Sequence, residues 1–374
     1  MDKTDYAGIE ISAKELLVAL RRDGKLKPWK SFPNTPQGHR AIVRYLARPE
    51  RLLQVCLEST GVYGLDLALA LHAAPGIEVR VANPRAVRHF AQALLERSKN
   101  DRLDALVLVE FAARLPFQPW PAPSAAALAL HALARRLQAL TELCTAEKNR
   151  LHATQAAQAL PQIICQDLKQ SIRFHQRALA RLTREALKLI AQEAELQLRF
   201  NLLLTLPGVA QTSALQILAE LAVQSADLDV RQWVAQASLD PREHTSGKSV
   251  HKKTRISKAG NAHLRRALYM PALLAVRHDP HFRAYYEHLL ARGKLKMQAL
   301  VAVSPRRPSC STPSTGCSGT CCPSRAPRFI SSGQPPSPTP LLPERRPHET
   351  HNSTRCMRLQ VANLPCNSRE NLPR

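Results

Sequence analysis

Four acidic residues of this chain stand where a carboxylate could hold a metal ion. Glu10 ends the apolar run AGIE, and Glu58 ends the apolar run QVCLE. Asp101 and Asp104 lie three residues apart in SKNDRLDALVL, a spacing that places both on one face of a helix. An acid in a core strand is unfavourable unless it is paired, protonated or bound to a metal. Each acid alone would more often be an ordinary strand-end or helix-face residue, so the prediction of a metal site depends on all four together.

Such a site would use oxygen ligands only, and these select Mg²⁺ or Mn²⁺. If the first and fourth predicted strands are neighbours, their ends bring Glu10 and Glu58 together, and a helix that carries both aspartates can close the cluster. Two such ions clamp the attacking and leaving oxygens in phosphoryl transfer. The expected chemistry is therefore phosphoryl transfer on a polyanion.

The charge of the chain indicates which polyanion. There are 53 Lys and Arg residues against 29 Asp and Glu, a formal charge of +24. Lys and Arg supply most of the non-specific affinity for nucleic acid by neutralising phosphates. A membrane surface is the other available polyanion, but no apolar run approaches the ~20 residues of a spanning helix, and no signal peptide opens the chain. Nucleic acid is the expected partner, and we expect no membrane association.

The elements that must position these acids can be read from the first 110 residues. Apolar runs predict strands at 6–12, 15–24, 27–33, 51–59 and 78–83, and helical patterns follow at 36–47, 63–74 and 84–95. A three-strand start followed by alternating helices and strands predicts an α/β fold with a mixed sheet and flanking helices.

Helices are expected beyond the proline-rich break at 115–124. Leucines at 3–4 spacing predict two long amphipathic helices around a break near Pro161. An ordinary helical hairpin is the simpler interpretation, and a dimerising coiled coil is the alternative. Residues 202–221 resemble a helix-hairpin-helix element, whose Leu-Pro-Gly-Val turn would offer backbone N–H groups to a phosphate. A plain helix-turn-helix with a glycine cap is the alternative there.

A basic segment follows, because residues 244–278 contain no acid. We interpret this segment as the strongest nucleic-acid surface of the chain. The candidate contacts are Lys248, Lys252, Lys253, Arg255, Lys258, Arg265 and Arg266.

The motifs of both halves resemble one family. GIEIS, LESTGVY and KNDRLDA are similar to the patterns G-I-D-x-S, E-x-T-G-x-Y and K-x-D-x-x-D-A of the RuvC-like domain in DEDD transposases of insertion-sequence family 110/1111, which are Piv-related. LPGVAQTSALQILAEL, SLDPREHTSGKS and TRISKAGNAHLRRALYMPAL resemble the family's C-terminal transposase domain. The resemblance covers roughly residues 5 to 303.

The resemblance implies a fold and a domain order. It implies an RNase H-like (RuvC-like) DEDD nuclease domain at 1–115, a helical linker or coiled coil at 116–200, and a C-terminal transposase domain at 201–303. Residues 304–374 remain as a tail. It also implies a homo-oligomer, a dimer or tetramer, in the bacterial cytoplasm and associated with the nucleoid when bound.

The resemblance further implies roles for single residues. Glu10, Glu58, Asp101 and Asp104 would be the Mg²⁺ or Mn²⁺ carboxylates. Ser246, which precedes a glycine, would be the nucleophile that attacks a DNA phosphate and forms a phosphoserine link. The DNA partners would be the element ends and the target, chosen with a structured guide RNA. By itself, the TSG triplet is also an ordinary polar turn.

Three departures from the family pattern predict an impaired enzyme. Glu10 replaces an aspartate, and octahedral Mg²⁺ tolerates the extra methylene poorly. Ser238 stands where the family has glycine, which matters if the backbone there has a positive φ. The match also stops after Val303. With suitable synonymous codons, CSTPSTGCSGT read one base back gives LLHAIYGMFRH, which resembles the family's next helix.

We therefore predict that the tail is out of frame and disordered. Without the lost helix, the apolar stripe of Met297, Leu300 and Val301 would need another partner. Five tail residues could suggest zinc, but their spacing fits no established site; they are Cys317, Cys321, Cys322, His348 and His351.

Three other functions remain open. The chain could be a RuvC-like nuclease without a serine intermediate, in which case Ser246→Ala would leave cleavage intact. It could be a catalytically dead nucleic-acid-binding remnant. A structural basic protein without any site is the third alternative.

Overall fold

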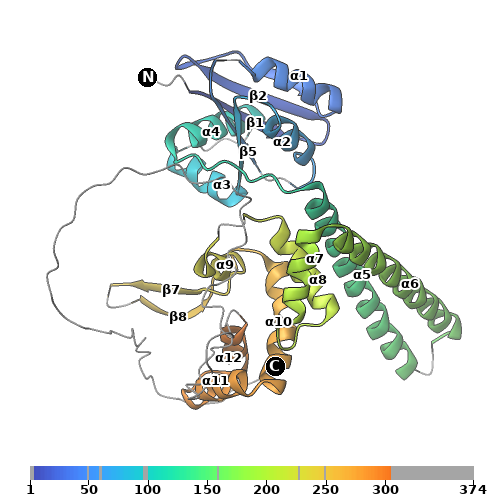
Figure 1. The fold of residues 1–374 in the computed structure, drawn as a ribbon. Helices are drawn as coiled ribbons and strands as arrows, with labels where there is room; N and C mark the ends of the chain where they lie inside the picture. Colours follow the sequence, from blue (N-terminus) through green and yellow to red (C-terminus); the bar gives the residue numbers. More distant parts are fainter. Residues whose placement is uncertain are drawn as a thin grey trace, which may run out of the picture. The chain divides into compact units, whose positions relative to one another are not determined.

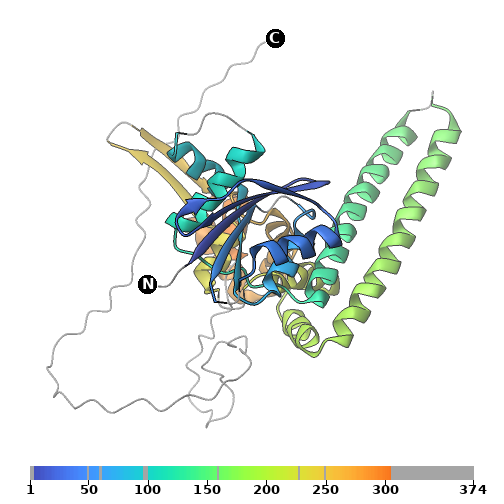
Figure 2. The same cartoon turned by 90° about the horizontal axis from the view of Figure 1, so that it is seen from above.

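The computed structural model describes residues 4–48, 50–58, 61–95, 100–157, 160–225, 228–247 and 250–304 (Figures 1 and 2). Its first strands are β1 (Asp5–Ile11), β2 (Glu15–Arg22), β3 (Lys25–Leu26), β4 (Lys30–Pro33), β5 (Leu53–Glu58) and β6 (Ile77–Ala82). They form one mixed sheet in the order β3-β2-β1-β5-β6, with β4 paired to β2. β1 is antiparallel to β2 and parallel to β5, which is parallel to β6. The predicted mixed α/β sheet is confirmed.

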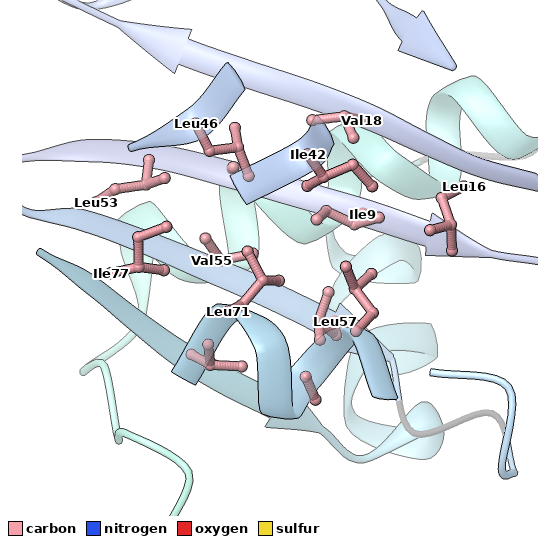
Figure 3. Close-up of a cluster of buried hydrophobic side chains, with 14 of the residues drawn as sticks. Ile9, Leu16, Val18, Ile42, Leu46, Leu53, Val55, Leu57, Leu71 and Ile77 are labelled. Carbon is pink, nitrogen blue, oxygen red and sulfur yellow. The ribbon is translucent and has the colours of Figure 1, made fainter. Parts of the chain in front are cut away.

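Each face of the sheet is covered by helices. Every second side chain of β1 and β5, including Ile9 and Leu57, enters an aliphatic core under α1 (Pro36–Leu46) and α2 (Leu65–His72) (Figure 3). The opposite face packs against α3 (Pro84–Ala93) and α4 (Asp101–Arg114). α4 therefore lies on the face to which the alternate residues of β1 and β5 point.

A glycine allows α4 to approach the sheet closely. A Cβ atom built on Gly8 would lie 2.2 Å from the backbone oxygen of Ala105 and 2.7 Å from the Cβ of Leu108. Real Cβ atoms do not approach a backbone so closely, so a larger residue would push the helix away. The glycine of the GIEIS motif thus holds α4 against the strand that carries Glu10.

The helical linker is an antiparallel pair, α5 (Ala125–Ala156) and α6 (Gln162–Gln192), as the leucine spacing predicts (Figures 1 and 2). Leu130 and Leu137 of α5 and Ile190 of α6 pack with α7 (Ala194–Leu204) and α8 (Gln211–Ala222). The predicted domain limit at residue 200 falls inside α7. None of the described helices is both long and apolar enough to cross a membrane.

The last described elements are α9 (Val230–Gln236), β7 (Pro241–Ser246), β8 (Val250–Ile256), α10 (Ala262–His278), α11 (Pro280–Ala291) and α12 (Lys296–Val303). The β7–β8 hairpin was not expected from the sequence. All residues of β7 are exposed, so the alternation of apolar and polar residues that predicts a half-buried strand is missing.

α12 corrects one expectation. Leu300 is 6% exposed and packs against Phe282 of α11, and the half-buried Val301 packs against a second apolar cluster, so two of the three stripe residues already have partners. Met297 alone of the three expected stripe residues is strongly exposed, at 55%. The predictions of an out-of-frame, disordered tail and of its zinc-like residues concern 305–374, which lie outside the described residues.

Candidate active site

The two acid-bearing strands are direct neighbours. β1 and β5 run parallel with Ile9 opposite Leu57, so Glu10 and Glu58 follow in register at the carboxyl ends of their strands. Both acids alternate with residues of the α1–α2 core, and both therefore share the face that α4 covers. The predicted adjacency of the strand that ends in Glu10 and the strand that ends in Glu58 is confirmed.

The two aspartates lie at the first turn of α4. The side chain of Asn100 caps this helix by accepting a hydrogen bond from the backbone N–H of Leu103 at 2.8 Å. Acids in a first turn interact favourably with the helix dipole, so Asp101 and Asp104 also stabilise the start of α4.

Two of the four predicted acids line one hollow of about 460 Å³. Glu10 and Asp101 both line it, whereas Glu58 and Asp104 are not among its lining residues. It is further lined by Ser12, Glu15, Leu17, Ser31, Asn100 and Arg102. Within the described ranges, no three His, Cys, Asp or Glu side chains come close enough to hold a metal ion. The donor chemistry of the four acids fits Mg²⁺ or Mn²⁺, while the side-chain positions bring only Glu10 and Asp101 to one hollow.

Sequence reasoning missed an asparagine that ties the ends of both acid-bearing strands together. Asn34 Nδ2 donates to the backbone oxygen of Ser12, just after β1, at 2.9 Å and to that of Tyr63, in the loop after β5, at 3.1 Å. His39 Nε2 lies 2.7 Å from Asn34 Oδ1. Because the amide nitrogen serves two carbonyls, its oxygen is the acceptor and His39 Nε2 donates. No sequence motif marks Asn34, because the carbonyls that it binds belong to residues 22 and 29 positions away.

The buried position of His39 suits a neutral donor. His39 is 7% exposed. Burial lowers the pKa of His39, and the nearby charge of Asp66 partly opposes this effect. A neutral imidazole carries one N–H group, and because His39 Nε2 donates to Asn34, that nitrogen carries the proton. The Asn34–His39 pair is thus a rigid support behind the carboxylate edge of the sheet.

Ser246 lies at the tip of the β7–β8 hairpin. It pairs with Val250 across the turn, is exposed, and precedes Gly247, whose φ is +54°. This placement is that of a polar turn, and it also leaves the hydroxyl accessible to a large substrate.

The predicted nucleic-acid contacts divide into three groups. Arg255 and Lys258 are exposed. Arg265 donates to the backbone oxygen of Ala237 at 3.2 Å, and Arg266 forms an ion pair with Glu142 of α5, so these two have partners within the chain. Lys248 and the side chains of Lys252 and Lys253 lie outside the described residues.

Two transposase families match this chain. Residues 7–157 match the transposase family DEDD_Tnp_IS110, and residues 200–287 match the Transposase IS116/IS110/IS902 family. Together they cover more than half of the chain. The chain belongs to the IS110 family of transposases. This family acts on DNA.

Curated relatives of this transposase include two invertases. The pilin gene-inverting protein of Moraxella lacunata is 27% identical over 310 residues, which is 81% of this chain and 92% of that protein. The pilin gene-inverting protein of Moraxella bovis is 26% identical over 312 residues, with the same shares. An uncharacterized 43.6 kDa protein of insertion element IS110 from Streptomyces coelicolor is 31% identical over 105 residues, 28% of this chain and 26% of that protein.

One departure of this transposase from the family pattern has a clear structural consequence. Ser238 has a φ of +53° and is 0% exposed, so it occupies the left-handed conformation that glycine adopts freely. Its hydroxyl accepts a hydrogen bond from the backbone N–H of Gly260. The serine therefore combines backbone strain with a buried hydrogen bond.

The Leu-Pro-Gly-Val turn of this transposase joins α7 and α8. Gly208 has a φ of +80°, and a Cβ atom there would lie 2.5 Å from the backbone oxygen of Pro271. The glycine is therefore required for close packing against α10 as well as for the turn. This arrangement is a helix-turn-helix with a glycine, and phosphate binding by its N–H groups stays a prediction.

Proposed function

We propose that this transposase cleaves and rejoins DNA through a phosphoserine intermediate, with Ser246 as nucleophile and with Mg²⁺ or Mn²⁺ held by Glu10, Glu58, Asp101 and Asp104. The observation that supports the carboxylate site is the register of β1 and β5, which sets two acids side by side on the face under the first turn of α4. We further propose that this sheet is an RNase H-like (RuvC-like) domain.

In this proposal Ser246 Oγ gives up its proton and attacks a DNA phosphorus. A bond from Oγ to phosphorus forms, the bond from phosphorus to a sugar oxygen breaks, and that oxygen takes up a proton. The exposed tip of the hairpin lets the hydroxyl meet a duplex without rearrangement of a core. Arg255, opposite Arg242 near the base of the hairpin, and Lys258 beyond it would bind phosphates that flank the reacting one.

A divalent ion bound by the carboxylates would supply further stabilisation of the phosphate charge. Glu10 and Asp101 would hold it first, because both already line the same hollow. Glu58, next to Glu10 in register, and Asp104, in the same first turn as Asp101, would complete the set. The longer Glu10 side chain is expected to weaken metal binding relative to aspartate.

The wider assembly is also a proposal. DNA at the element ends and at the target, a structured guide RNA and a second copy of the chain are the expected partners, on the strength of the family membership. The division into 1–115, 116–200 and 201–303, with a helix-hairpin-helix in the last part, belongs to the same proposal.

The test is a strand-transfer assay in a Glu10→Asp background, with a denaturing gel to detect covalent protein–DNA product. We expect Ser246→Ala and Glu58→Gln each to reduce transfer by roughly 10²-fold or more, and only Ser246→Ala to abolish any trapped covalent product. Thr245→Ala, at the neighbouring exposed position, is the matched control and should retain activity.

Two results would overturn parts of the proposal. Cleavage that persists in Ser246→Ala but not in Glu58→Gln would identify a RuvC-like nuclease without a serine intermediate. DNA binding without cleavage in every variant, the Glu10→Asp parent included, would identify a binding remnant.

A further inference from the structure

The outer face of α6 carries a continuous row of basic side chains. All six of its members are exposed, and they recur every three or four residues; they are Lys169, Arg173, Arg177, Arg181, Arg184 and Lys188. At about 100° per residue, the six fall within roughly one third of the helix circumference. The buried residues Leu168, Ile172 and Ile190 lie on the opposite side. The row, which we name the α6 basic row, therefore faces solvent.

Acidic residues are absent from this sector of α6. Asp167 and Glu185 are its two acids, and at the same angular spacing both fall outside the third that carries the row. From Lys169 to Lys188 the row extends about 28 Å, at roughly 1.5 Å per residue. The result is a straight, rigid line of positive charge.

The pairing of charges differs between the two helices of the hairpin. On α5, Arg150 pairs with Glu147 at 2.5 Å and Arg135 pairs with Glu220 of α8 at 2.8 Å. On α6, no member of the row forms an ion pair with an acid of the described ranges. A surface built only for solubility would mix both signs, as α5 does.

We propose that the α6 basic row is a second DNA-binding surface, which contacts the phosphate backbone of duplex DNA. It is separate from the 244–278 segment and does not depend on the proposed chemistry at Ser246. A duplex carries one negative charge per about 1.7 Å of its axis, so a rigid basic row of this length meets several phosphates. Single-strand surfaces interleave several stacking aromatics with their basic residues, and Phe174 is the one exposed aromatic of α6.

The test compares two triple variants of the full chain, and duplex binding is measured in EDTA so that no metal-dependent cleavage occurs. The first is Arg173→Gln, Arg177→Gln and Arg181→Gln. The matched control, Lys25→Gln, Arg40→Gln and Arg44→Gln, removes the same charge from exposed positions of the sheet body. Duplex affinity is measured over a range of salt concentrations. Glutamine is a good helix former, and the three substituted positions are exposed, so the melting temperature should not change.

We expect the α6 triple variant to lose about tenfold in duplex affinity and to make the negative slope of log K against log salt shallower by about 2.7, which corresponds to three phosphate contacts. The control should change the slope by much less. A third variant with lysine at all three α6 positions should keep the wild-type slope, which shows that charge is what matters.

Equal losses in the α6 and control triples would mean that only the net charge of the chain is at work, and the proposal would fail. Loss of binding to a structured RNA with unchanged duplex binding would also overturn it. Because cleavage is not measured, these outcomes are independent of whether Ser246 is the nucleophile.

Discussion

Glu220 of α8 and the predicted metal acids of β1, β5 and α4 lie in different surroundings. Glu220 is 1% exposed, with Arg135 Nε at 2.8 Å and Asn261 Nδ2 at 2.5 Å from its carboxylate oxygens. Burial alone would raise the pKa of Glu220. Hydrogen bonds from His131 and Asn261 and the charge of Arg135 outweigh that effect and lower the pKa of Glu220 to about 2.

The acids of the sheet have acids as neighbours. Glu10 lies beside Glu58 in register and shares a hollow with Asp101. The comparison shows two kinds of surroundings for an acid: Glu220 is buried among hydrogen-bond donors and a cation, while Glu10 and Asp101 line a hollow beside other acids.

The largest expected effect on stability is that of Glu220→Ala. This change leaves Arg135 and Asn261 without their buried acceptor and should lower the free energy of unfolding by about 3–5 kcal/mol. Chemical denaturation measures it. Glu58→Gln is the control at the other acid group and should change the free energy of unfolding by much less. Comparable losses in both variants would contradict the distinction between structural and catalytic acids.

The pH dependence of stability should also reflect the interactions of Glu220 with Arg135 and Asn261. The pKa of Glu220 is lower in the folded state than its ordinary value of 4.5, so its stabilising effect is present above pH 4.5 and is lost as the pH falls toward 2. A shift of this size corresponds to about 3 kcal/mol. Melting curves between these pH values should show a smaller decline in Glu220→Gln than in the wild type. Parallel declines would show that other groups dominate.

Substitutions of Asn34 and of its neighbour Thr35 should have smaller effects on stability, and these should differ from each other. Thr35 caps α1 by accepting a hydrogen bond from the N–H of Gly38 at 3.2 Å, so Thr35→Ala should cost about 1 kcal/mol. Asn34→Ala should cost about 1–2 kcal/mol, since it removes two donors and the acceptor of His39. Asn34→Ala should in addition weaken Mn²⁺ binding to the carboxylates, because it releases the ends of both acid-bearing strands.

Calorimetric titration with Mn²⁺ checks this difference. Thr35→Ala should bind Mn²⁺ as the wild type does. Asn34→Gln keeps the amide, so it should bind Mn²⁺ more tightly than Asn34→Asp. Unchanged Mn²⁺ affinity in Asn34→Ala would leave Asn34 a purely structural residue.

The sequence alone determined the local elements and the residue types of the candidate site. Apolar runs and leucine spacing predict strands β1, β2, β4, β5 and β6 of the sheet and the long α5–α6 hairpin, because these signals depend on residues that are close together in the chain. The four acids were also identifiable, since each lies at the end of a recognisable strand or in the first turn of a helix. A positive φ at Ser238 was a stated condition only because the resembling family has glycine at that position.

Tertiary structure decided which of these residues meet. That Asn34 holds Ser12 and Tyr63, 22 and 29 residues away, follows from strand pairing that no local pattern encodes. Arg135 and Glu220 are 85 residues apart, and in sequence Glu220 looks like any acid on an amphipathic helix. Every residue of β7 is exposed, so no apolar alternation marks that strand, and the position of Ser246 near the tip of the hairpin follows only from the pairing of β7 with β8. Long-range contacts pair groups by geometry, and a linear pattern records only spacing along the chain.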